Sequence, residues 1–143
     1  MIQRLAAFAY HDPLALVLAI KRRLPKHVDR WAAALNMPQV IGGFIFIWRW
    51  EGALILAAWT ATMLTAGWIH RHAPMSRLIG LCQLWWLPVL PVVALTAWQE
   101  GLTLFALLAG YIVITMTVSL AIDAYDLYRY SQGDRTYDGA SRP

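Results

Sequence analysis

The chain has 143 residues, of which 59% are hydrophobic and 14% are charged, and its mean hydropathy is +0.49. Soluble domains are roughly 45–50% apolar and about 25% charged. A water-soluble fold of this size cannot cover so much apolar surface, which excludes most soluble classes, including dinucleotide-binding domains and disulfide-stapled secreted modules. We therefore expect a single-domain, all-α integral membrane protein.

Basic residues outnumber acidic ones, 12 against 8, which gives a formal net charge of +4. The basic residues flank apolar blocks, so attraction to anionic lipid headgroups explains them better than a nucleic-acid site does. We expect bound lipid and no nucleic-acid partner. Cys82 is the only cysteine, which excludes an intramolecular disulfide and the thiol oxidases that work through cysteine pairs.

Residues 1–30 are expected to form an interfacial amphipathic segment of one or two helices. The segment starts like a signal peptide, but the cations Lys21–Arg23 stand where cleavage needs small residues, so we expect it to be retained. Asp12 as N-cap and Pro13 as first helical residue predict a helix over Pro13–Leu24. Pro25 then starts a second segment.

Four apolar blocks follow, and we expect them to be transmembrane helices at approximately residues 31–48, 52–69, 78–97 and 102–122. The first is the least apolar, so the distribution of cations decides whether it crosses. With four crossings and a cytoplasmic N-terminus, eleven of the twelve cations lie inside and only Arg49 lies outside, as the positive-inside rule favours. Three crossings divide the cations seven against five. A fifth crossing would place Asp12 near mid-membrane, which is costly.

This topology predicts two helical hairpins across residues 31–122 and a polar cytoplasmic tail over residues 123–143. It places the protein in a bacterial-type inner membrane with both termini cytoplasmic. The fourth helix is expected to run past the interface, and the Gly- and Asp-rich chain beyond Ser131 is expected to be flexible unless something else holds it.

Small residues recur at helical spacing in the second and fourth predicted spans. Such rows let helices approach closely in lipid. The second span carries two neighbouring rows of small residues, and one of these rows holds Ala58, Thr62 and Ala66. The residues that we expect to mediate helix packing are Ala53, Ala57, Ala61, Thr65, Ala106 and Gly110.

Aromatic residues mark the expected partner surface. Pro88 and Pro91 in the third predicted span each remove a backbone hydrogen bond and should bend it. Trp85 and Trp86 come just before that bend, and two adjacent indoles cannot both face one neighbouring helix. The full set of expected partner contacts is Trp31, Trp85, Trp86, Tyr125 and Tyr128.

Chemistry-bearing residues are sparse in the predicted spans. No Asp or Glu stands mid-span, which disfavours a small multidrug-type exchanger, and Gln83 heads the buried polar candidates. A histidine is able to ligate a pigment or haem, with His11 and His70 as the candidates, although neither is mid-span. His70, His72 and Met75 are the candidates for a metal site at the cytoplasmic edge.

The leading functional hypothesis is a non-catalytic accessory, assembly or stabilising subunit of a larger inner-membrane complex, such as a respiratory or photosynthetic one. Its basis is small size, many packing surfaces and the lack of a catalytic signature. The alternative is a small homo-oligomeric transporter or channel, and the third hypothesis is a pigment- or haem-binding membrane protein. No catalytic residue is predicted, no cofactor is required, and membrane lipid and a larger protein complex are the expected partners.

Overall fold

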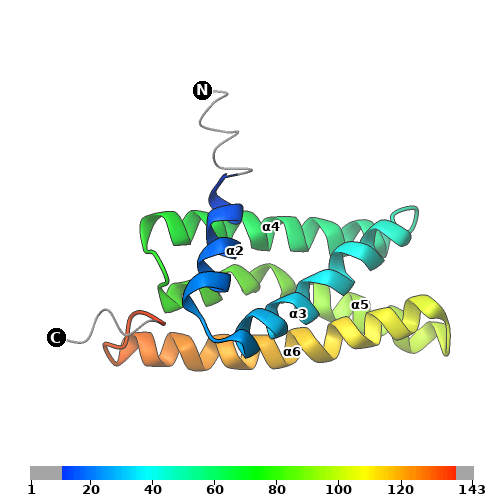
Figure 1. Ribbon diagram of the computed structural model, residues 1–143. Helices are drawn as coiled ribbons and strands as arrows, with labels where there is room; N and C mark the ends of the chain where they lie inside the picture. The colour runs from blue at the N-terminus through cyan, green and yellow to red at the C-terminus, as the bar shows by residue number, and fades with distance from the viewer. Residues whose placement is uncertain (1–10, 138–143) are drawn as a thin grey trace.

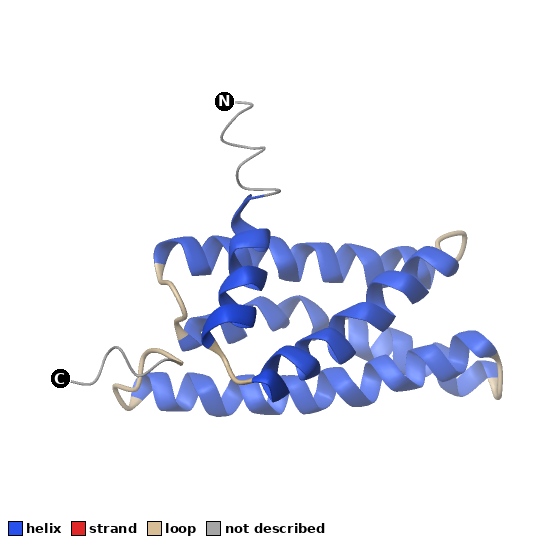
Figure 2. Ribbon diagram, viewed as in Figure 1, coloured by secondary structure: helices blue, strands red, loops and turns tan. Residues whose placement is uncertain are grey.

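The computed structural model describes residues 11–137, and this part of the chain is helical, with one isolated bridge between Ser76 and Thr136. Figure 2 shows short loops between the helices. The expected all-α class is confirmed. The helices are α2 (Asp12–Arg23), α3 (Lys26–Ile45), α4 (Trp50–His72), the 3₁₀ helix η2 (Arg77–Trp86), α5 (Val89–Glu100) and α6 (Leu104–Ser131).

The helix α2 matches the helix predicted over Pro13–Leu24 to within one residue at each end, but the prediction of Asp12 as its N-cap is wrong, because Asp12 is already helical and His11 is the N-cap. Pro13 stands in its first turn, and three cations occupy its last turn, where they oppose the helix dipole favourably. It lies across α4 (Figure 1) and buries Leu16 against Ala66 and Cys82. Part of the apolar face of this amphipathic helix therefore packs on the protein itself, whereas Leu14 and Leu18 are exposed.

The expectation of four transmembrane helices is corrected by the structure. Within residues 11–137, α4 and α6 are each long and apolar enough to cross a membrane, and the bent pair η2 and α5 makes a third candidate if it counts as one span. The predicted first span, residues 31–48, falls in α3, which starts with charged residues and ends at Ile45. Its backbone then leaves the helix at residues 46–49.

Polar side chains in the middle of α3 explain why this helix differs from α4 and α6. The Asn36 oxygen accepts a hydrogen bond from the Trp59 indole at 2.9 Å, and Gln39, 2% exposed, donates to the Met116 sulfur at 3.0 Å. These side chains point into the bundle, where partners satisfy them. They lower the hydropathy of α3 without facing lipid.

The predicted bend in the third apolar block is confirmed. The chain runs as a 3₁₀ helix from Arg77 to Trp86, turns by 48°, and continues as α5. Runs of 3₁₀ helix beyond three or four residues are uncommon, and a long one often marks a functional hinge or strain. The ten residues of η2 contact both α4 and α6.

The core lies between α4, η2, α5 and α6, with α3 crossing diagonally over them (Figure 1). Its most buried side chains include Ile55, Trp86, Val93, Ile112 and Met116, none more than 1% exposed. At one end of the bundle, Arg49 bonds both Glu51 and Glu100 and lies 4.3 Å from the centre of the Phe105 ring. This residue ties the 46–49 turn to the 101–103 link.

The small-residue row predicted on the second span is not the one that packs. Ala53 and Ala57 are exposed and Ala61 and Thr65 are half-buried, whereas the neighbouring row is buried. Adjacent rows on a helix differ by about 100° of rotation, and the contacts of α4 with α2 and η2 select the second one. That buried row is Ala58, Thr62 and Ala66.

On α6, Ala106 is 8% exposed and packs as expected. Gly110 does not mark a close approach, because a Cβ placed there would have no neighbour within 4 Å. The close approaches occur at other glycines. At Gly67 a Cβ would lie 2.6 Å from the backbone nitrogen of Pro13 and 2.8 Å from the carbonyl carbon of Asp12.

Substituting Gly67 should therefore separate α2 from α4. We expect Gly67→Ala to destabilise the protein by about 1–3 kcal/mol, because backbone atoms of α2 cannot yield without moving the helix. Gly110→Ala is the matched control, and it should be neutral or stabilising by up to about 1 kcal/mol, since alanine favours a helix interior. Thermal unfolding in detergent measures both, and equal effects would contradict this packing.

Candidate functional site

A row of facing polar residues, which we name the polar seam, lies between η2 and α6. In a 3₁₀ helix, residues three apart lie on one face, which aligns Arg77, Gly80 and Gln83. On the α-helix α6, residues at spacings of three and four share a face. These are Ser119, Asp123 and Asp126.

Each residue of the η2 row contacts one residue of the α6 row. Arg77 bonds Asp126, and the Gln83 amide donates to the Ser119 hydroxyl at 3.4 Å. Between them, a Cβ built on Gly80 would lie 3.2 Å from Oδ1 of Asp123. Gly80 thus leaves space for the Asp123 side chain in the middle of the seam.

Arg77 is the central residue at the open end of the seam. Its side chain is 9% exposed, and its guanidinium bonds Asp126 and, at 3.2 Å, Asp134. Asp134 also pairs with Arg129. Charge-assisted bonds of this kind are required here, because an unpaired buried guanidinium is strongly unfavourable.

The chain after α6 folds back to cover this ion pair. The backbone nitrogen of Arg77 donates to the Arg135 carbonyl at 3.0 Å, and that of Tyr137 donates to the Met75 carbonyl at 3.0 Å. The Tyr137 ring lies 4.9 Å from the Arg77 guanidinium carbon. The tail was expected to be ordered only if something else contacts it. Up to residue 137, these contacts come from η2 and the residues just before it in the same chain. We name residues 132–137 the tail latch.

Tyr137 binds Asp126 as a donor. Its hydroxyl donates to Oδ2 of Asp126 at 2.8 Å. Burial raises the pKa of the phenol, and the neighbouring Asp126 carboxylate raises it further, because both disfavour a second negative charge. The phenol therefore keeps its proton, and with it this bond, throughout the neutral range.

Three buried atoms of the seam have no hydrogen-bond partner: Arg77 Nε, Gln83 Oε1 and Asp123 Oδ2. Buried polar groups are normally satisfied, so each exception calls for an explanation. Asp126 bonds the guanidinium of Arg77, and Asp134 bonds those of Arg77 and Arg129. Asp123 is the one carboxyl group of the seam that has no ion pair with a residue between 11 and 137.

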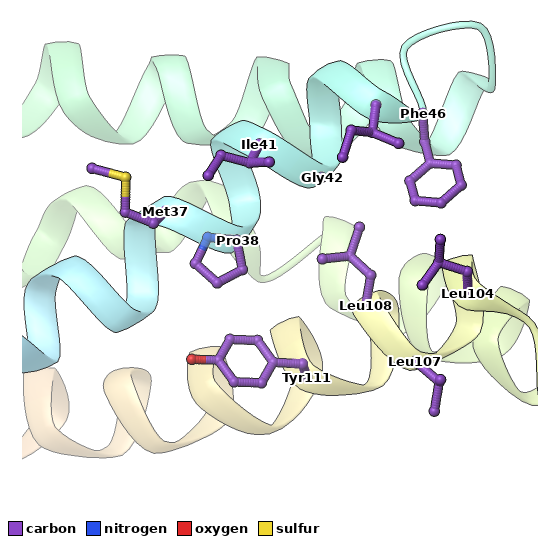
Figure 3. A pocket seen from close by; sticks show the side chains of 10 residues that line it. Met37, Pro38, Ile41, Gly42, Phe46, Leu104, Leu107, Leu108 and Tyr111 are labelled. Carbon is purple, nitrogen blue, oxygen red and sulfur yellow. The ribbon is translucent and has the colours of Figure 1, made fainter.

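A second surface feature is an apolar groove between α3 and α6, shown in Figure 3. Its volume is about 500 Å³. The Tyr111 hydroxyl, at its edge, already donates to the Ala34 carbonyl at 2.8 Å. The lining residues are Met37, Pro38, Ile41, Gly42, Ile45, Phe46, Leu104, Leu107, Leu108 and Tyr111.

The expected partner-contact residues divide into exposed and buried ones. Trp85 is 53% exposed, and its indole donates to Thr65 at 2.9 Å. Trp86 is 1% exposed and belongs to the core, so its expected role as a partner contact is corrected. It lies one 3₁₀ turn beyond Gln83, on the face that η2 turns inward. The other three, Trp31, Tyr125 and Tyr128, are exposed.

The candidate ligand residues make other contacts in the structure. His11 is exposed at the start of α2. His70 Nδ1 accepts a hydrogen bond from the Met75 backbone at 3.3 Å, and His72 Nδ1 bonds the Trp68 carbonyl at 2.8 Å. Met75 itself is 1% exposed. Residues 11–137 contain no group of three or more His, Cys, Asp or Glu placed to hold a metal ion.

Sequence reasoning assigned Asp123 and Asp126 to the polar tail and treated Arg77 as a loop cation. The sequence did hold a signal. The two acids are three residues apart on the helix that continues past the membrane, and they are predicted on the same side of the membrane as Arg77. A comparison of the chain with protein-family models, curated proteins and solved structures finds no match. Its function is therefore argued from its own residues.

Removal of Arg77 should release the tail latch. Arg77→Leu leaves Asp126 and Asp134 without their buried partner, and breaking such a pair costs about 3–5 kcal/mol. Trypsin should then cleave after Arg135 much faster than in the unaltered protein. Arg71→Leu is the control, since the Arg71 side chain is 54% exposed and lies 3.4 Å from Asp12, and ion pairs of exposed side chains are worth at most about 1 kcal/mol. Unchanged cleavage of Arg77→Leu would contradict the latch.

Proposed function

We propose that the protein is a non-catalytic accessory, assembly or stabilising subunit of a larger bacterial inner-membrane complex, such as a respiratory or photosynthetic one. The observation that carries the proposal is the apolar groove between α3 and α6 (Figure 3). The proposed occupant is an apolar transmembrane helix of the partner. The protein acts by binding this helix, and the groove supplies the complementary surface.

The chemistry of the groove suits a helix better than a polar substrate. The one polar group on its lining side chains, the Tyr111 hydroxyl, is already bonded. An unbonded polar ligand would lose its hydration there without compensation. A ridge of leucine or isoleucine side chains has no such cost, and close packing against a small residue such as Gly42 is what drives helix association in lipid.

The outer face of α3 supports the same proposal. Met37, Ile41, Phe44 and Ile45 are each 49–59% exposed, although α3 as a whole falls short of the hydropathy of a spanning helix. A partner helix lying along the groove would cover this face and the exposed side of α6. It would stabilise α3 in a position that its own hydropathy supports only in part.

The proposed orientation places both termini in the cytoplasm. The charged α2–α3 corner and the polar seam lie away from the end that carries the 46–49 turn and the 101–103 link (Figure 1). Of the ten Lys and Arg residues between 11 and 137, nine belong to the first group and only Arg49 to the second. The positive-inside rule then assigns the Arg49 end to the outer side.

Filling the groove should separate the protein from its complex. We expect Leu107→Trp to abolish comigration with a larger assembly on native gels after mild-detergent extraction, because the indole occupies the space of the partner's ridge. Leu95→Trp on α5 is the control, since Leu95 is similarly exposed, at 57% against 61%, and lies outside the groove. Migration of the unaltered protein as a lone monomer would overturn the proposal.

A second candidate function is a small homo-oligomeric transporter or channel, favoured by the polar seam beside the broken span of η2 and α5. Discontinuous helices and buried ionisable residues are typical of transport sites. In a liposome flux assay, Gln83→Ala should lower the rate at least several-fold if the seam is the pathway, with Thr117→Ala as a control on the outer face of α6. Flux no greater than that of empty vesicles would exclude this candidate.

A further inference from the structure

Asp123 is a charged residue without a counter-ion. Asp126 and Asp134 each bond a guanidinium, whereas Asp123 has no ion pair with any residue between 11 and 137. Its Oδ2 is fully buried and unpartnered. A buried carboxylate in this state is strongly unfavourable unless something neutralises it.

The surroundings of Asp123 supply further oxygen ligands. Gln83 Oε1 is also buried and unpartnered, and it belongs to the side chain that donates to Ser119 at 3.4 Å. Ser119 lies one α-helical turn before Asp123, and Gln83 lies one 3₁₀ turn after Gly80, which Asp123 touches. The middle of the seam thus carries carboxylate, amide and hydroxyl oxygens from facing helices.

We propose that the polar seam binds one monovalent cation, a proton or an alkali ion, with Asp123 as the charged ligand and Gln83 and Ser119 as neutral ligands. Either cation would neutralise the unpaired Asp123 carboxylate. A proton on Oδ2 turns an orphaned acceptor into a donor for the neighbouring amide oxygen. An alkali ion bonds these oxygens directly, as hard cations prefer.

The third orphaned atom fits this arrangement. Arg77, at the end of the same seam, has a side chain that is 9% exposed, and its Nε donor is unpartnered. A water molecule carried by the cation would supply the missing acceptor, since a coordinated water retains acceptor capacity. The tail latch covers this end of the seam and limits the access of bulk water.

Other charged and titratable groups face the site from each packed element. They are Arg77 and Cys82 on η2, Asp126 on α6, and Asp134 and Tyr137 on the tail latch. Arg77 and Asp126 are paired, and Tyr137 donates to Asp126. Asp123 is thus the group whose charge state is open to change by a cation.

The experiment measures thermal unfolding of the full chain in detergent, in titrations with sodium chloride, with potassium chloride and with pH. Choline chloride at equal concentration controls for ionic strength. A ligand that binds only the folded state raises the midpoint with its concentration. We expect the midpoint to rise with a small alkali ion but not with choline, or to rise as the pH falls towards 5.

Asp123→Asn should abolish this rise, because the amide has nearly the same shape and no charge. Asp29→Asn on α3 is the matched control and should keep it. Gln83→Leu should weaken the apparent affinity about tenfold or more, as loss of a supporting ligand does, and it tests the site should Asp123→Asn fail to fold. Dependence on pH alone identifies the proton, and dependence on sodium or potassium identifies an alkali ion.

The proposal is overturned if no cation shifts the midpoint beyond choline and pH has no effect, or if Asp123→Asn and Gln83→Leu respond like the unaltered protein. The measurement uses the chain by itself. Its failure would therefore leave the accessory-subunit proposal intact, and loss of comigration in the groove variant would leave the cation site intact.

Discussion

The ion pair between Arg77 and Asp126 is the contact on which one whole end of the molecule depends. A buried guanidinium must be paired and hydrogen-bonded, and Arg77 finds its partners on α6 and on the chain beyond it. That demand fixes the start of η2 against the end of α6 and draws residues 132–137 back over both. Residues that would otherwise trail into solvent become part of the fold.

The pairing of residues along the seam depends on two different helical periods, that of the 3₁₀ helix η2 and that of the α-helix α6, which match over this short stretch. The three-residue period of η2 aligns Arg77, Gly80 and Gln83, while α6 presents Asp126, Asp123 and Ser119. An α-helix at residues 77–86 would rotate these side chains away from one another. The unusual length of η2 is therefore the geometric condition for the seam, and Trp86 anchors its inner end in the core.

The groove and the seam divide the molecule into two kinds of surface. The seam concentrates buried polar groups and unpaired charge, whereas the groove offers apolar surface with its polar group already satisfied. The first suits a small charged species and the second suits a helix. Both depend on α6, which forms one wall of the groove near Leu107 and one side of the seam near Asp123.

The sequence by itself determined the all-helical class with helices apolar enough to span a membrane, helix α2 to within one residue at each end, and the bend at Pro88, because composition and proline act locally. It also suggested that the chain after Ser131 needed something to hold it. It overcounted the spans, because hydropathy cannot tell that Asn36 and Gln39 turn inward to Trp59 and Met116.

Only the tertiary structure decided which small-residue row of α4 packs, which of two adjacent indoles is buried, and where the seam lies. Ala57 and Ala58, or Trp85 and Trp86, are nearly equivalent in sequence, and the neighbouring helices select between them. Asp123 shows the same limit. Local sequence places it at the end of an apolar helix, and long-range packing against Gly80 makes it an unpaired carboxylate whose Oδ2 is buried.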